Sequence, residues 1–329
     1  MLSARNKIRN LILIATAAMV VAAAKPIVQA QSVSDQQDMA NLTTATSSPP
    51  LPSNYMSLPA KKLFGSFKLP DKLPAQPIGT YAKGCMQGAA ELPHDGPAWQ
   101  VMRLSRNRNW GNPKLIALVE RLATEAKAND GWNGLLVGDI AQPRGGPMIS
   151  GHASHQIGLD ADIWLTPMPN RTLTYKERET MAATVMTKSH TELDRSVWTE
   201  SRARLIKRAA QYPEVGRIFV HPPIKAELCR WSKTIGGDQS WLAKVRPLYG
   251  HNYHFHIRMK CPEGAKFCKD QWTPHPKDGT GCGEELAYWL GDGPWKPHKP
   301  NPNAPKVPPP PPLTLSGLPA QCRAVVTAP

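Results

Sequence analysis

The chain has 329 residues, and its 40 lysines and arginines outnumber its 25 aspartates and glutamates, for a formal net charge of +15 at pH 7. This length suits one domain with additional segments, and the positive charge favours anionic partners such as nucleic acid, membrane headgroups or cell-wall polymers. No run of basic residues with interleaved aromatic residues occurs, which argues against nucleic acid, and a basic protein with no charge-driven partner remains an alternative.

Residues 1–30 have the pattern of a secretory signal peptide. Three basic residues precede an apolar run from Leu11 to Ala24, and the small-x-small motif Val28-Gln-Ala30 follows it. Because the run is too short to cross a bilayer, we expect cleavage near Gln31 and no integral membrane association afterwards. A membrane anchor that stays attached is the alternative interpretation.

Composition divides the rest of the chain into three parts. Residues 31–75 are rich in polar residues and proline with little apolar periodicity, which predicts a flexible N-terminal arm or a segment that wraps around the domain. Residues 76–295 have a globular composition and are expected to form one domain. Residues 296–329 are a Pro-rich tail with a polyproline run at 308–312, which is either a free linker or, as Cys322 beyond it indicates, a segment that returns to the domain.

Helices and strands interleave within the globular part without a regular βαβ repeat. Apolar periodicity and capping patterns predict helices over residues 113–128, from the capping box Thr174-x-x-Glu177 onward, and over 201–211. Runs of β-forming residues predict strands over 134–140, 216–220 and 253–259. The expected class is α+β, with helices around a central antiparallel sheet.

The segment Tyr253-His254-Phe255-His256-Ile257 is expected to be a strand with two unlike faces. Because side chains alternate along a strand, His254 and His256 point to one side, whereas Tyr253, Phe255 and Ile257 point to the core. Such a pair of histidines can hold a metal ion or, alternatively, form hydrogen bonds to the backbone inside the core.

A second segment places two carboxylates in a similar alternation. Asp160 and Asp162 alternate with apolar residues, and His155 precedes them across a turn that Gly158 permits. Two acids on one face of a strand are costly to bury unless they are paired or bind a metal, although a solvated face is the alternative. Two imidazoles and one carboxylate are sufficient to hold one Zn²⁺ and leave a position for water.

Four motifs give the chain a family resemblance. GHASHQIGLDADI (151–163), AQPRGGPM (141–148), LSRNRNWG (104–111) and GHNYHFHIRMKCP (250–262) resemble those of penicillin-insensitive murein endopeptidases. The spacing His155-x6-Asp162 with His254-x-His256 is also similar to the zinc signature of lysostaphin-type endopeptidases, D-Ala-D-Ala carboxypeptidases and hedgehog signalling domains. The resemblance covers roughly residues 80–290 and does not extend to the N-terminal arm or the polyproline run.

The resemblance implies a periplasmic zinc metallopeptidase with one Zn²⁺ per chain. Its implied activity is hydrolysis of D-alanyl–meso-diaminopimelate cross-links in peptidoglycan. By motif matching, His155, Asp162 and His256 are the implied zinc ligands and His254 the catalytic histidine. A D,D-carboxypeptidase with the same metal set, and a zinc-containing cell-wall-binding protein without catalysis, are the alternative functions.

Four further residues have open roles. His251 lies beside the His254 motif and is a candidate for proton transfer, whereas His152 is a candidate support for the ligands, an outer ligand or a substrate contact. Both are alternatively ordinary loop histidines. Asp160 either orients a ligand imidazole or caps a turn. Arg144, in a Gly-rich loop, either binds a stem-peptide carboxylate or has a structural role.

The six cysteines are expected to form disulfides. An even number of cysteines without a CxxC motif, in a chain with an export signal, favours disulfides over thiolate metal sites. The spacing alone leaves the pairing open. The family resemblance implies three pairs, namely Cys85–Cys322, Cys229–Cys282 and Cys261–Cys268.

Overall fold

The computed structural model describes residues 50–271, 274–296 and 308–329. The predicted signal peptide and the beginning of the expected N-terminal arm lie outside these residues. No helix in the described part combines the length and apolar character that crossing a membrane requires.

The described chain alternates short strands and helices. The strands are β1 (Gln76–Thr80), β2 (Lys83–Gln87), β3 (Ala90–Glu91), β4 (Asp95–Gly96), β5 (Trp99–Val101), β6 (Trp110–Gly111), β7 (Leu135–Val137), β8 (Asp160–Trp164), β9 (Val215–Val220), β10 (Val245–Pro247) and β11 (His254–Met259). The α-helices are α2 (Ala60–Gly65), α3 (Pro113–Asn129), α4 (Tyr175–Thr180), α5 (Glu200–Gln211), α6 (Pro222–Ile235), α7 (Glu284–Leu290) and α8 (Cys322–Thr327). Four 3-10 turns are η1 (Leu104–Arg106), η2 (Ser240–Lys244), η3 (Gly293–Trp295) and η4 (Leu315–Gly317).

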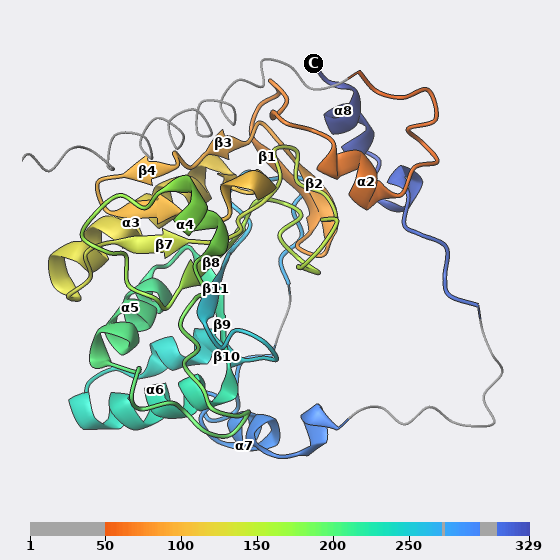
Figure 1. The fold of residues 1–329 in the computed structure, drawn as a ribbon. Helices are drawn as coiled ribbons and strands as arrows, with labels where there is room; N and C mark the ends of the chain where they lie inside the picture. The colour runs from red at the N-terminus through yellow and green to blue at the C-terminus, as the bar shows by residue number, and fades with distance from the viewer. Residues whose placement is uncertain (1–49, 272–273, 297–307) are drawn as a thin grey trace, which may run out of the picture.

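A seven-stranded sheet with the order β10-β9-β11-β8-β7-β5-β4 forms the centre of the described residues (Figure 1). Its middle is antiparallel, because β11 pairs with β8 and β9, and β8 pairs with β7. The pairs β9–β10 and β5–β7 are parallel. The α+β class is confirmed, but the sheet is mixed, since α6 and α3 supply the long crossovers that parallel neighbours need.

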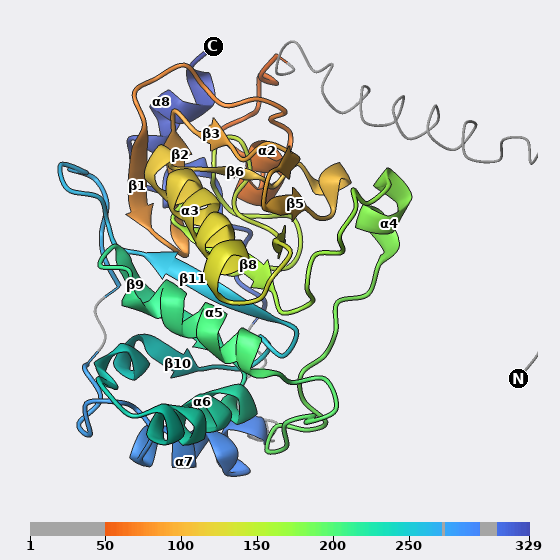
Figure 2. The ribbon, with the colours of Figure 1, turned by 90° about the vertical axis from the view of Figure 1, so that its left-hand side faces the viewer.

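Helices α3 and α5 lie side by side over one face of this sheet (Figure 2). The predicted helix at 113–128 is confirmed as α3, whose first turn contains Pro113 and whose preceding Asn112 side chain accepts a hydrogen bond from the backbone N–H of Lys114. The capping box predicted at Thr174 and Glu177 is also present, at the start of α4. The apolar face of α3 is buried against the sheet, so that only the other face of the sheet is available for a site.

The two ends of the described chain pack together beside the β1–β2 hairpin (Figure 1). Leu63 and Phe64 of α2 share a buried cluster with Leu315, Val325 and Val326 from the C-terminal segment. Residues 51–67 of the expected arm therefore pack against the C-terminal segment. The sequence lacks a periodic apolar run there because the partner that buries this short helix comes from the other end of the chain.

All three disulfide pairs implied by the family resemblance are confirmed. Cys85–Cys322 joins β2 to α8, Cys229–Cys282 joins α6 to the segment before α7, and Cys261–Cys268 closes a short loop after β11. The first of these bonds attaches the tail to the domain, in agreement with the expectation that the tail returns to it.

Candidate metal centre and active site

Strands β8 and β11 bring the predicted residues together through their register. Asp162 lies opposite His256, and Asp160 lies opposite Arg258. The intervening side chains, which include Phe255 and Ile257, are fully buried in the core, so the histidines and aspartates share the other face. The alternation predicted for this segment is confirmed, except that Tyr253 precedes β11, is 38% exposed and lines the pocket instead of the core.

His155 reaches the same face from the loop before β8. Its backbone has a φ of 66°, and Gly158 has a φ of 67°. A Cβ at Gly158 would lie 2.0 Å from Met86 Sδ and 2.9 Å from the Asn112 backbone nitrogen, so this turn requires glycine. A left-handed conformation at a histidine costs on the order of 1–3 kcal/mol and is typical of functional sites.

Three side-chain atoms converge on one point. His155 Nε2 lies 3.1 Å from His256 Nδ1 and 3.5 Å from Asp162 Oδ1, and His256 Nδ1 lies 3.2 Å from Asp162 Oδ1. A tetrahedral zinc ion with such ligands requires separations of about 3.3 Å between ligand atoms. The predicted ligand set therefore has the spacing that a zinc ion needs.

The outer ring nitrogen of each imidazole lies next to an oxygen atom. His155 Nδ1 lies 2.6 Å from the Ile140 carbonyl oxygen, and His256 Nε2 lies 3.0 Å from Asp160 Oδ1. With a proton on each of these nitrogens, His155 Nε2 and His256 Nδ1 present lone pairs to each other. Asp162 Oδ1 is buried and accepts no hydrogen bond among the described residues. Three buried electron-rich atoms repel one another unless a cation lies between them, so these residues fit a metal ion.

Asp160 lies beside both His155 and His256. It contacts the His256 imidazole, and its Oδ2 accepts a hydrogen bond from the backbone N–H of His155 at 2.9 Å. Arg258 donates to both of its oxygens, at 2.8 and 3.0 Å. Burial raises the pKa of Asp160, but His256 and Arg258 outweigh this effect and hold the pKa well below its usual range. Asp160 therefore stays ionised, and it contacts both His155 and His256.

His254 and His251 lie next to the three converging atoms. His254 Nε2 is 3.7 Å from Asp162 Oδ1, and its buried Nδ1 has no hydrogen-bond partner in the described part of the chain. The ring of His251 lies 5.0 Å from that of His254, and its Nδ1 lies 2.9 Å from the Tyr249 carbonyl oxygen. Burial lowers the pKa of both imidazoles, to about 3 for His251, so both are neutral at neutral pH.

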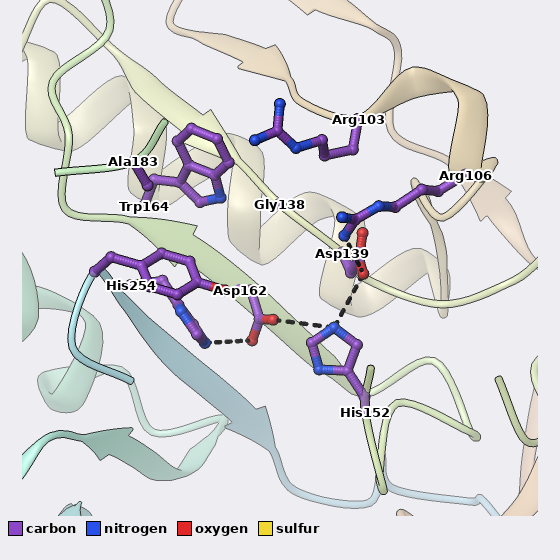
Figure 3. Close-up of a pocket in the computed structure, with 10 residues that line it drawn as sticks. Arg103, Arg106, Gly138, Asp139, His152, Asp162, Trp164, Ala183 and His254 are labelled. Carbon is purple, nitrogen blue, oxygen red and sulfur yellow. Dashed lines mark hydrogen bonds and ion pairs between the residues drawn. The ribbon is translucent and has the colours of Figure 1, made fainter. Parts of the chain in front are cut away.

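His152 borders a cavity of about 290 Å³ beside the converging atoms (Figure 3). Its Nε2 lies 3.0 Å from Asp139 Oδ2 and 3.6 Å from Asp162 Oδ2. His152 can also contribute to a ligand group with His155 and Asp162. The cavity is lined by Arg103, Arg106, Gly138, Asp139, His152, Asp162, Trp164, Ala183, Tyr253 and His254.

Asp139 was not identified from the sequence. It is buried and accepts hydrogen bonds from Arg108 at 2.8 Å and Arg106 at 3.1 Å, in addition to its contact with His152. Burial raises the pKa of Asp139, but the His152 hydrogen bond and the Arg108 charge outweigh it and lower the pKa to about 2. The signal that could have identified it is its position as the lone acid at the end of an apolar strand segment.

Arg144 is not among the residues that line this pocket. Its buried guanidinium donates to the backbone carbonyls of Val325 at 2.7 Å, Ala328 at 2.8 Å and Leu69 at 3.3 Å, and it lies over the ring of Phe67. Of the two roles considered for Arg144, these contacts support the structural one. Arg144 connects the two terminal segments of the described chain.

Comparison with known proteins agrees with this geometry. A family model described as penicillin-insensitive murein endopeptidase matches residues 77–327, a range that includes the C-terminal helix α8. The chain is 46% identical over 241 residues to the penicillin-insensitive murein endopeptidase of Haemophilus influenzae, an alignment that covers 73% of this chain and 80% of that protein. It is 39% identical over 252 residues to the protein of the same name from Klebsiella pneumoniae, covering 77% of this chain and 86% of the relative. The chain therefore belongs to the family of penicillin-insensitive murein endopeptidases.

Proposed function

We propose that the protein is a zinc-dependent endopeptidase that hydrolyses D-alanyl–meso-diaminopimelate cross-links in peptidoglycan, outside the cytoplasm in the periplasm. The observation that carries this proposal is the convergence of His155 Nε2, His256 Nδ1 and Asp162 Oδ1, with His254 beside them. The names of the relatives support murein endopeptidase activity. Three disulfides and the signal-like N-terminus support export.

His155, Asp162 and His256 would hold the zinc ion. Bound there, zinc would polarise the scissile carbonyl and lower the pKa of a water molecule toward neutrality. The contacts of His155 with the Ile140 carbonyl and of His256 with Asp160 keep the two imidazoles in the orientation that presents a lone pair.

His254 would move the proton. It is neutral and buried, and one of its ring nitrogens has no hydrogen-bond partner among the described residues, so it is able to accept a proton from the attacking water. The same imidazolium would then protonate the leaving amine, and the nearby Asp162 carboxylate would stabilise its positive charge. No serine or cysteine is acylated in this scheme, so a β-lactam has no nucleophile to block.

Digestion of purified sacculi tests this proposal. The pure protein should convert cross-linked muropeptides to monomers. This activity should be lost after treatment with a chelator and should return when zinc is added back. Mass analysis of the products separates the alternatives, because a D,D-carboxypeptidase releases free D-alanine and a binding protein releases nothing. Activity that persists without metal would contradict the zinc-dependent mechanism, and penicillin should have no effect on the rate.

A further inference from the structure

Two arginines stand on one wall of the pocket, across from His254 (Figure 3). Arg103 and Arg106 flank the 3-10 turn η1, at its N-cap and its last position. Arg103 has a φ of 59°, a conformation that is rare for a residue with a side chain. Backbone strain of this kind is typical of segments that position ligand-binding groups.

Arg103 is rigidly held and lacks an acidic partner. Its guanidinium donates to the backbone carbonyls of Arg178 at 2.8 Å and Met181 at 2.7 Å, and it lies 5.3 Å from the centre of the Trp164 ring. Within the described residues it forms no ion pair. A guanidinium fixed by neutral groups beside a pocket keeps its remaining donors and its full charge available for an anion.

Arg106 adds a second positive charge to this wall. Its side chain is 46% exposed, and among the described residues only one of its nitrogens has a partner, Asp139 Oδ2 at 3.1 Å. Arg108, which is more deeply buried, already binds that carboxylate at 2.8 Å. The positive charge of Arg106 is therefore only partly compensated, in contrast to that of Arg108.

We infer that Arg103, with Arg106 beside it, binds the free carboxylate on the amine side of the scissile bond. This inference rests on the proposed function. In a D-alanyl–diaminopimelate cross-link, the carbon attached to the scissile nitrogen also carries a free carboxylate, and this group lies within ~4 Å of the scissile carbonyl carbon. A hydrogen bond adds ~3 Å, so the cation belongs about 7 Å from the reacting carbon.

Arg103 reaches the same cavity as the converging atoms. The centre of the Trp164 ring lies 5.3 Å from the Arg103 guanidinium, and Trp164 follows Asp162 by two residues on the same face of β8. Arg103, Asp162 and His254 all line this cavity. The carboxylate thus has a defined position between the metal ligands and η1. Since a stem peptide with an amidated carboxylate presents no negative charge there, the subsite predicts discrimination between the two forms.

The test uses two cross-linked muropeptide dimers that differ only in whether this carboxylate is free or a carboxamide. The wild-type protein should have a kcat/KM roughly 10–100-fold higher for the free carboxylate, the usual size of a lost hydrogen bond to a charged group. Arg103→Gln should reduce this ratio to about 1, because it should lower the rate for the carboxylate dimer far more than the rate for the carboxamide dimer. Arg106→Gln removes a more exposed side chain and should reduce the ratio partially. This variant replaces Arg103→Gln in the test if Arg103→Gln does not fold.

Arg121→Gln is the matched control, because it removes a surface arginine that pairs with Glu214. It should preserve the ratio. Equal rates for both dimers in the wild type, or an equal loss for both dimers in Arg103→Gln, would overturn the inference and leave the proposed function intact. A wild-type protein that cleaves neither dimer would overturn the proposed function, and this inference with it.

Discussion

At one end of the polar face shared by β8 and β11, Asp160 is paired with Arg258, whereas at the other end the described residues beside the Asp162 carboxylate are histidines. Both aspartates are buried and lie on the same strand. The protein itself compensates the charge of Asp160, and leaves Asp162 Oδ1 without a hydrogen bond among the described residues. The comparison indicates that one end of this face stabilises the fold, whereas the other end has the features that the proposed metal site requires.

Replacement of His256, which lies opposite Asp162, should have the largest effect on activity. His256→Ala removes one of the three converging atoms, so the protein should lose its zinc and at least about 10³-fold of its activity, comparable to the removal of preorganised electrostatic stabilisation. Metal analysis and sacculus digestion measure both quantities. Full zinc content with unchanged cleavage would show that His256 is not a ligand.

Removal of His254 should separate metal binding from proton transfer. His254 shares the face with the ligands but is not assigned to the metal, so His254→Ala should keep its zinc and fold while activity falls by roughly 10²–10⁴. Loss of zinc in this variant would reassign His254 as a ligand. Near-normal cleavage with full zinc would mean that another group transfers the proton, and His251 is the first candidate.

The two aspartates should respond oppositely when each is replaced by asparagine. Asp160→Asn leaves the buried Arg258 without its charged partner, which typically costs about 3–5 kcal/mol of unfolding free energy, and zinc affinity should fall by roughly 10–100-fold. Asp162→Asn should lose zinc, yet its metal-free form should be at least as stable as metal-free wild type, because lone-pair repulsion decreases. Thermal unfolding of the chelated proteins compares them, and a larger destabilisation by Asp162→Asn would contradict the distinction.

The smallest effect on activity is expected at Arg144. Arg144→Met leaves three backbone carbonyls without their donor, so the unfolding free energy should fall by about 2–4 kcal/mol. Cleavage by the folded protein at low temperature should stay within about twofold of wild type. A specific rise in KM without loss of stability would instead support the substrate contact that the structure argues against.

The sequence predicted the parts of the site that depend on local alternation. His254 and His256 share a face because they are two residues apart in a strand, and Asp160 and Asp162 share a face for the same reason. The motif match then joined the two strands. Their register, which sets His256 opposite Asp162, depends on pairing over almost a hundred residues and has no local signal.

Features that depend on distant partners were missed or assigned incorrectly. Asp139 lies within a predicted strand, and its role became visible only when the fold brought His152 and Arg108 to it. Helix α2 lacked the pattern of an amphipathic helix because it is short and its buried contacts come from the C-terminal tail. Arg144 was grouped with the site because its loop carries a family motif, yet its partners lie in the terminal segments.

Diffraction at the zinc absorption edge, from crystals of the zinc-loaded protein, tests the central claim most directly. We predict one strong anomalous peak per chain, bound by His155 Nε2, Asp162 Oδ1 and His256 Nδ1. A peak held by His152 and Asp139 without His256, or no peak at this position, would contradict the assignment of the metal centre.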